Sequence, residues 1–390
     1  MWPPPRLTVN LPIKFSDMLN EWSHDSAEAK ELLLSIEVTA THDDDRPVYI
    51  TGNFNNWVTD DDRFKMVKLE HGKYHFTFPA GMQLPQTIEY KFVKSGAWHN
   101  VEIDTYGNTP PNRRIEKTRG YVKDHVYRFQ TNGQFYNPRF LPQIQLLTNG
   151  DDIPKMRIKR NIWAVLPYNY YQSSEYYPVL YLHDAQNLFN DNAPFGNWAI
   201  DRKLAVLAER NMGNLIIIAI DHAGHKRIHD FSLYPMRTKP QEGKKYVNFI
   251  SNVLKPYVDQ NLRTLTHRDN TGIGGSSLGG LVSIYAGLTQ PLVFSKLMVF
   301  SPSLWMNPHI HFESMHIKKT YQTKVYIYAG GQEGANMVNN VYSFKETLEK
   351  QGISEANLRF RLNIDPEGKH NERYWGEEFP KAVEWLYFSN

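Results

Sequence analysis

Two nearly uninterrupted apolar runs constrain the fold of this sequence more than any other feature: YPVLYLHD at 177–184 and NLIIIAID at 214–221. A strand that is apolar at every position needs a sheet covered on both faces, as in parallel sheets flanked by helices. Further strand patterns lie at 160–167, 271–275, 296–302, 324–331 and 358–365, and helical patterns at 244–262, 278–290, 341–352 and 379–388. This alternation predicts an α/β domain with a mostly parallel sheet over residues 144–390.

The first third of the chain has a different pattern. Short strand patterns lie at 32–40, 46–54, 72–80 and 87–95, with turn residues and no amphipathic helix between them. This spacing predicts a small antiparallel β-sandwich of the immunoglobulin-like kind. A short helix is expected within 14–34, with Ser16 and Asp17 as candidate N-caps. We therefore divide the chain into residues 1–130, a linker at 131–143 and the α/β domain at 144–390, in keeping with a length of 390 residues.

Composition excludes several functional classes. The 44 basic and 41 acidic side chains are well mixed, with a net charge of +3 and no basic stripe, so we expect no nucleic-acid partner. The absence of Cys excludes a thiol nucleophile, a disulfide and Cys-ligated zinc. No apolar run reaches transmembrane length, and the N-terminus lacks the pattern of a secretory leader. We expect no membrane partner and a cytoplasmic protein, or a secreted or periplasmic one whose leader has been removed.

The stretch GIGGSSLGGL at 272–281 falls between a strand pattern and a helical pattern. Its segment 275–279 reads G-x-S-x-G with Ser277 at the centre, the motif of a sharp turn that exposes a nucleophilic serine. Glycines are expected on both sides because a Cβ there would collide across so tight a bend. The motif is short, and the alternative is that Ser277 is an ordinary turn residue.

Candidates for a base and an acid follow later strands. α/β-Hydrolases present serine, acid and histidine in that order at the carboxyl ends of strands. Glu333 follows the strand pattern at 324–331, and His370 follows the one at 358–365. His370 would take the serine proton and Glu333 would orient its ring, with Asp365 as the second-choice acid. The backbone N–H of Leu278, together with that of Ala185 or Gln186, would form the oxyanion hole.

Five motifs in this order resemble the putative-esterase family, which includes esterase D, enterochelin esterase and the feruloyl and acetyl-xylan esterases of carbohydrate esterase family 1. They are YPVLYLHDAQNLF, IGGSSLGG, FSPSLW, YIYAGGQEG and EGKHNERYW. The resemblance covers about residues 145–390 and implies a triad of Ser277, Glu333 and His370. Two departures stand out. Many members have Gly at the position of Ala185. In addition, HDFSLYP stands where relatives have R-x-x-E-Y-x-P, and this second departure argues against the family's substrate contacts near His229 and Asp230.

The N-terminal part resembles a starch- or glycogen-binding module of carbohydrate-binding families 20 and 48. The resemblance rests on VYITGNFNNW, YKFVKSGAWHNVEID and GNTPPNRR, within residues 33–120. It implies that Trp57 and Trp98 stack on glucose rings, that Lys91 bonds to sugar hydroxyls and that Asn112 completes the site. Indole faces pack well on the C–H faces of pyranose rings. The alternative is that both indoles belong to the core of a small sandwich.

Other polar clusters do not predict a cofactor. His222, His225 and His229 lack the regular spacing of metal ligands, and the acidic turns at 42–47 and 59–64 lack the spacing of a calcium loop. The His-containing segment 309–317 is expected at the surface or in a lid. We expect neither a metal nor a cofactor.

Together these patterns predict a serine esterase that works through an acyl-enzyme on an acetyl or feruloyl type ester of a carbohydrate, or on a related ester. An α-glucan or another glycan is a candidate further ligand. The alternatives are a siderophore-type esterase, a glycan-binding protein with an inactive hydrolase-like domain, and an enzyme that transfers the acyl group to a sugar.

Overall fold

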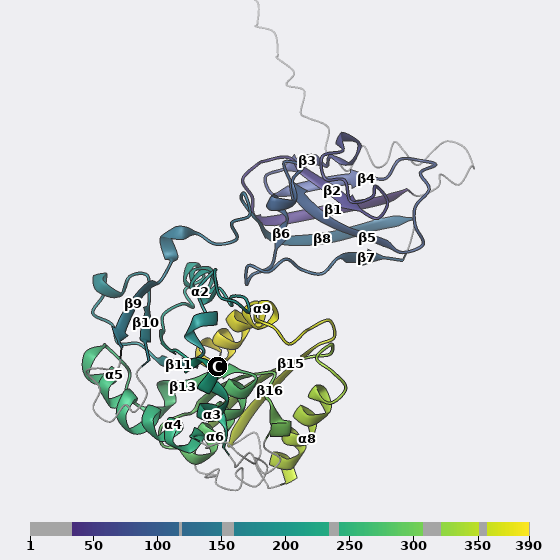
Figure 1. The fold of residues 1–390 in the computed structure, drawn as a ribbon. Helices are drawn as coiled ribbons and strands as arrows, with labels where there is room; N and C mark the ends of the chain where they lie inside the picture. Colours follow the sequence, from purple (N-terminus) through teal and green to yellow (C-terminus); the bar gives the residue numbers. More distant parts are fainter. Residues whose placement is uncertain are drawn as a thin grey trace, which may run out of the picture.

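The computed structural model describes residues 33–116, 119–149, 160–233, 242–306, 321–350 and 357–389. Figure 1 shows a β-sandwich built from the N-terminal part and, beside it, a larger domain in which helices surround a central sheet. The helix expected within 14–34 lies outside the described residues, except for Leu33 and Leu34, and Leu34 already begins a strand.

The sandwich pairs a five-stranded sheet with a three-stranded one. The larger sheet has the order β3 (Val67–Glu70), β4 (Lys73–Thr77), β1 (Leu34–His42), β8 (Gly120–Phe129), β6 (Glu102–Ile103), and the smaller has β2 (Val48–Gly52), β5 (Ile88–Lys94), β7 (Arg113–Ile115). All four predicted strands are present. One pairing departs from the antiparallel expectation, because β1 and β8 run parallel. They are the first and last strands of the sandwich, so no hairpin turn fixes their relative direction.

The second domain contains the mostly parallel sheet that the sequence predicts. Its order is β16 (Leu358–Asp365), β15 (Thr323–Gly330), β14 (Lys296–Phe300), β13 (Thr271–Ser276), β11 (Val179–His183), β12 (Ile216–Ile220), β10 (Ile162–Leu166), β9 (Gln143–Thr148). Strands β11 to β16 run parallel to one another, while β10 is antiparallel to both β12 and β9. Every residue of β11 and β12 is buried, which explains the two apolar runs.

Helices cover both faces of this sheet and complete the α/β-hydrolase fold. They are α2 (Ile200–Glu209), α3 (Arg227–Phe231), α4 (Gly243–Phe249), α5 (Lys255–Asn261), α6 (Leu278–Thr289), α8 (Met337–Lys350) and α9 (Glu372–Val383). One face packs against α4, α5, α6 and α8, and the other against α2 and α9. The helix expected at 244–262 is interrupted by a π-helical turn at Ile250–Leu254. Pro256 follows this turn, and proline supplies no N–H for the regular ladder.

Polar contacts join the sandwich to the α/β domain. The Lys203 ammonium on α2 donates to Asn108 Oδ1 at 2.5 Å and to the carbonyl of Gly107 at 3.2 Å. The Asn108 amide in turn donates to the carbonyl of Glu377 on α9 at 2.9 Å. Burial lowers the pKa of Lys203 to about 8, so these acceptors stabilise a costly buried charge. Figure 1 shows α2 and α9 on the side that faces the sandwich.

We expect Asn108→Ala to weaken this junction. The substitution removes both Asn108 contacts and leaves the Lys203 charge short of one acceptor, at a cost of about 2 kcal/mol. Urea unfolding followed by tryptophan fluorescence should show a lower midpoint for the full chain. Asn112→Ala is the matched control, since its exposed amide donates to the Glu89 side chain within the sandwich. Equal midpoints for the two variants would contradict a stabilising role for the junction.

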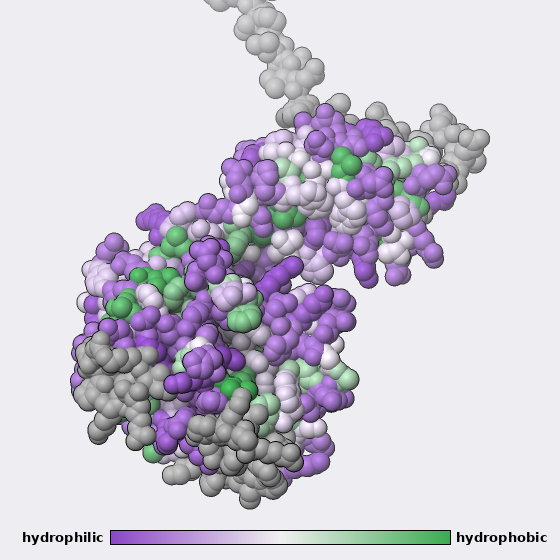
Figure 2. Space-filling view, viewed as in Figure 1, coloured by the Kyte–Doolittle hydropathy of each residue, from purple (hydrophilic) through white to green (hydrophobic). Residues whose placement is uncertain are grey.

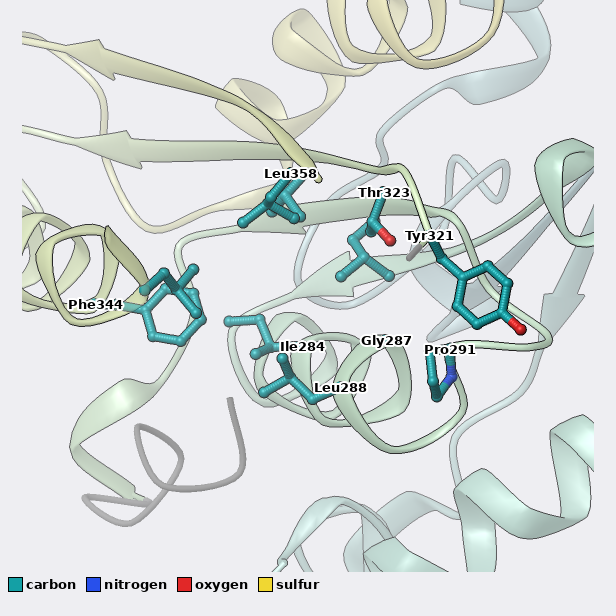
Figure 3. Close-up of a pocket in the computed structure, with 11 residues that line it drawn as sticks. Ile284, Gly287, Leu288, Pro291, Tyr321, Thr323, Phe344 and Leu358 are labelled. Carbon is teal, nitrogen blue, oxygen red and sulfur yellow. The ribbon is translucent and has the colours of Figure 1, made fainter. Parts of the chain in front are cut away.

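An apolar cavity lies between α6, α8 and the sheet, lined by Leu288, Phe344 and Leu358 among others (Figure 3). Its free volume of about 10 Å³ holds no more than one water molecule. Thr323 and Leu358 in its wall are the first residues of β15 and β16, so the cavity lies at the amino edge of the sheet. Ser277 follows the carboxyl end of β13, at the opposite edge. The cavity is therefore a packing gap remote from the predicted chemistry.

The face of the molecule shown in Figure 2 is mainly hydrophilic, with small separate apolar areas. Among the helices in the described ranges, none has both the length and the apolar character needed to cross a membrane.

Candidate active site

Ser277 occupies a sharp turn between β13 and α6. Its backbone has φ 58° and ψ −120°, an unusual conformation for a residue other than glycine. A Cβ at Gly275 would lie 3.0 Å from the His183 ring and 3.3 Å from the Gly279 backbone, so a larger residue would be crowded there and glycine is favoured. At Gly279 the nearest atom would be 3.4 Å away, an ordinary contact, so the collision expected at this position is absent. The turn has little room for a side chain at Gly275 and presents Ser277 at the carboxyl edge of the sheet.

His370 and Glu333 meet at the same edge of the sheet. His370 Nδ1 lies 2.8 Å from Glu333 Oε2, which is the contact expected of a base and its orienting acid. Glu333 Oε1 accepts from the Ser301 hydroxyl at 2.6 Å and from the Gly330 N–H at 2.7 Å. The Glu333 side chain is fully buried, so three donors hold one carboxylate in a fixed orientation. This arrangement leaves His370 Nε2 available for the proton of a nucleophile.

Asp365, the second-choice acid, makes other contacts. Its Oδ1 accepts from the N–H of Glu367 at 3.0 Å, and its Oδ2 accepts from the Tyr328 hydroxyl at 3.5 Å. The first contact belongs to the turn that follows β16, and the second comes from β15. The geometry therefore favours Glu333 as the partner of His370.

Ser277 and His370 line one cavity of about 500 Å³, which is within the usual size of small-molecule sites. The Ser277 hydroxyl lies 3.1 Å from the Ser303 hydroxyl. Hydrogen bonds between nucleophile and base are often loose without substrate, so this alternative partner is compatible with a catalytic serine. Trp375 also lines the cavity, and its ring contacts His370 edge-on at 4.9 Å between ring centroids.

The backbone donors expected at the oxyanion hole come directly after two residues that line this cavity, Asp184 and Ser277. Leu278 is the first residue of α6, and Ala185 and Gln186 begin a 3₁₀ turn at Ala185–Asn187, one residue after β11. N–H groups in the first turn of a helix have no partner within that helix and are available to an anion. The expected oxyanion donors thus lie at helix starts that follow neighbouring strands of the sheet, β11 and β13.

Five hydrogen bonds that the sequence did not predict hold the 184–187 loop. Arg227 binds the Asp184 carboxylate through Nε at 2.7 Å and through Nη2 at 2.8 Å. Gln186 exchanges hydrogen bonds with the backbone of His222, and Asn187 donates to Glu372 Oε1 at 3.1 Å. Burial raises the pKa of Glu372. Arg227 and Glu372 both line the cavity. Glu372 comes two residues after His370, and this proximity in sequence could have predicted its place at the site.

His183, just before this loop, connects it to the nucleophile helix. The Tyr246 hydroxyl lies 2.8 Å from its Nδ1, and the Ser283 hydroxyl lies 3.1 Å from its Nε2. Ser283 donates its own proton to the carbonyl of Gly279, so it accepts from Nε2–H, and Tyr246 donates to Nδ1. Burial lowers the pKa of His183 to about 4, in agreement with this neutral ring.

The histidine-rich segment is only partly at the site. His222 and His225 line the cavity, whereas Asp230 is buried and paired with Arg160 at 3.1 Å. Asp230 is thus held away from substrate, and the segment contributes Arg227 to the cavity instead.

Within the described ranges, one group of three possible metal ligands comes together, Asp43, Asp45 and His71 in the sandwich. Lys94 and Lys68 already bind these two carboxylates, so the cluster is accounted for as ion pairs. The segment 309–317 lies outside the described residues.

Trp57 and Trp98 lie side by side on the sandwich. Their ring centroids are 6.1 Å apart and the ring planes make an angle of 37°. Trp98 is 45% exposed and Trp57 is partly exposed, so neither is a core residue. Lys91 is different, because it is 8% exposed and its ammonium donates to the carbonyl of Pro110. With so little exposed surface, the Lys91 ammonium is poorly accessible to a sugar hydroxyl. Asn112 is exposed and donates to Glu89 at 3.1 Å.

The fold defines the class of this protein as an α/β-hydrolase, and comparisons with known proteins agree. In sequence, it is 27% identical to the ferri-bacillibactin esterase BesA of Bacillus subtilis (strain 168) over 208 residues, 45% of this chain and 69% of BesA. It is 25% identical to the B. subtilis protein YbbA over 247 residues, 59% of this chain and 94% of YbbA. In structure, it resembles the BES protein from Bacillus cereus with a TM-score of 0.51 and 19% identity, covering 64% of this chain and 95% of that one.

Residues 153–386 match the family model named Putative esterase, so the chain belongs to that family. It is a serine esterase, an enzyme that hydrolyses carboxylic esters.

Proposed function

We propose that Ser277 is the nucleophile, His370 the general base and Glu333 the acid that orients His370. The observation that carries this assignment is the Glu333–His370 hydrogen bond beside the cavity that Ser277 also lines. Ser277 Oγ attacks the ester carbonyl, and its proton passes to His370 Nε2. The carbonyl oxygen becomes an oxyanion that accepts from the N–H groups of Leu278 and of Ala185 or Gln186. His370 returns the proton to the leaving alcohol, and water then releases the acid.

Covalent labelling tests the nucleophile directly. A fluorophosphonate probe reacts with an activated serine, so the intact mass of the protein should rise by one probe equivalent. A panel of aryl acetate, feruloyl and acetylated sugar esters then defines the acyl and alcohol preference. Labelling on a residue other than Ser277 would refute the assignment.

The substrate class that we propose is an acyl ester of a carbohydrate or a related ester. Its support is the partly exposed Trp57–Trp98 pair, because adjacent indoles are suited to stacking on sugar rings. A glycan held on the sandwich would raise the effective concentration of nearby esters. A siderophore-type ester is the second candidate, favoured by the sequence relationship to the ferri-bacillibactin esterase BesA. The ester panel therefore includes a tri-catecholate lactone.

We expect Trp98→Ala to lower affinity for an α-glucan by about tenfold or more, because it removes one of two stacking surfaces. Affinity electrophoresis of the full chain in gels containing amylose measures this, with the thermal midpoint as a check on folding. Tyr121→Ala is the matched control, since Tyr121 is an exposed aromatic on β8 in the other sheet of the sandwich. Equal migration of the protein with and without amylose would rule out α-glucan binding.

A further inference from the structure

Arg227 binds Asp184, the residue at which the chain bends into the 184–187 loop. This loop carries the proposed oxyanion donors. Asp184 has φ 61° and ψ 49°, the left-handed region that residues other than glycine seldom adopt. The chain turns at this residue from β11 into the 3₁₀ turn that carries the N–H groups of Ala185 and Gln186. The direction of those two N–H groups therefore depends on the conformation of Asp184.

The contact between Arg227 and Asp184 is bidentate. Nε and Nη2 of the guanidinium bind Oδ1 and Oδ2 of the carboxylate, so the pair fixes orientation as well as distance. The Asp184 side chain is 8% exposed, so water screens this pair only weakly. Arg227 in turn packs on the Phe231 ring of its own helix, 5.0 Å from the ring centroid. Both ends of the contact are thus fixed.

We propose that Arg227 is a positioning residue for catalysis, which acts through Asp184 to aim the N–H groups of Ala185 and Gln186 at the reacting carbonyl oxygen. This inference rests on the proposed function of Ser277. Oxyanion donors are effective within about 2.7–3.1 Å of the developing charge, and a misplacement of about 1 Å can cost about 100-fold in rate. Two of the three nitrogens of the Arg227 guanidinium already bind Asp184. Because Arg227 also lines the cavity, the experiments below distinguish positioning from direct substrate binding.

The first test is Arg227→Ala on p-nitrophenyl acetate, a small substrate without charge that a substrate-binding arginine would not need. We expect kcat to fall by about 10-fold to 100-fold with KM within about threefold of the wild type. Affinity for an aryl trifluoromethyl ketone should fall by the same factor, because its tetrahedral adduct places an oxyanion at the same donors. A rise in KM with unchanged kcat would overturn the proposal in favour of substrate contact.

Chemical rescue separates positioning from general stability. Arg227 lines an open cavity, so millimolar guanidinium can enter the space left in Arg227→Ala and bind Asp184. We expect it to restore part of kcat. The matched control is Arg63→Ala, which removes an arginine with the same bidentate geometry to Asp61 from the surface of the sandwich. Arg63→Ala should keep wild-type kcat and show no response. No rescue of Arg227→Ala, combined with a lower thermal midpoint, would overturn the positioning role.

Asp184→Asn provides an independent arm, because asparagine tolerates the left-handed conformation but lacks the charge that Arg227 binds. We expect a loss of kcat similar to that of Arg227→Ala, and a double variant little worse than either single one. Fully additive losses would contradict a shared role. If Ser277→Ala kept wild-type activity, the proposed function itself would fail. If Ser277→Ala is inactive and Arg227→Ala is fully active, the positioning role alone fails.

Discussion

Ser277→Ala should lower kcat/KM for an activated aryl ester by several orders of magnitude, about 10⁵-fold. The substitution removes the atom that attacks the carbonyl. The residual rate then comes from substrate binding and from the oxyanion donors, which assist attack by water. Alanine adds no bulk at the turn, where Ser277 has φ 58°, so we expect the fold to be retained. Initial rates with p-nitrophenyl acetate and the loss of fluorophosphonate labelling measure the effect.

Ser276→Ala is the control for this prediction. Ser276 is the last residue of β13 and pairs with Phe300 of β14, so it is part of the sheet and precedes the turn. We expect this variant to retain most activity and to label normally. An inactive Ser276→Ala beside an active Ser277→Ala would mean that the other serine of GGSSLGG is the nucleophile.

The parts of the site that the sequence predicted are those set by local rules. The turn at Ser277 leaves little room for a side chain at 275, and the G-x-S-x-G motif reflects this crowding within five residues. The sequence predicted Glu333 and His370 as acid and base because both follow strands of a parallel sheet, whose carboxyl ends share one edge. Parallel pairing of β15 with β16 then brings the two loops together.

What the sequence could not predict depends on contacts between distant segments. Asp184 and Arg227 follow β11 and β12, and their pairing depends on which strands are neighbours and where each loop turns. No periodicity encodes such a contact. Lys91 shows the same limit. The resemblance to a starch- or glycogen-binding module pointed to this position, but it did not predict the contact between Lys91 and the carbonyl of Pro110. The parallel pairing of β1 with β8 likewise joins the two ends of the sandwich.

Glu333→Gln should reduce kcat by about 10³–10⁴-fold, because it changes the tautomer of His370. The Ser301 hydroxyl and the Gly330 N–H both donate to Oε1. Trp375 Nε1–H donates to Ser301 Oγ at 2.8 Å, so Ser301 is left to donate its own proton to Glu333. A glutamine must therefore turn its oxygen toward these two donors, and its NH₂ group toward His370.

That orientation determines the chemistry of His370 in the variant. Nδ1 has to accept from the glutamine NH₂, so the ring proton moves to Nε2, which can no longer take the proton of Ser277. The side chain keeps its shape and its contacts, so KM and the thermal midpoint should change little. Asp365→Asn is the matched control, and its contacts with Tyr328 and Glu367 lie outside the His370 network, so we expect near wild-type kcat. A severe loss in Asp365→Asn with an active Glu333→Gln would transfer the role of the acid to Asp365.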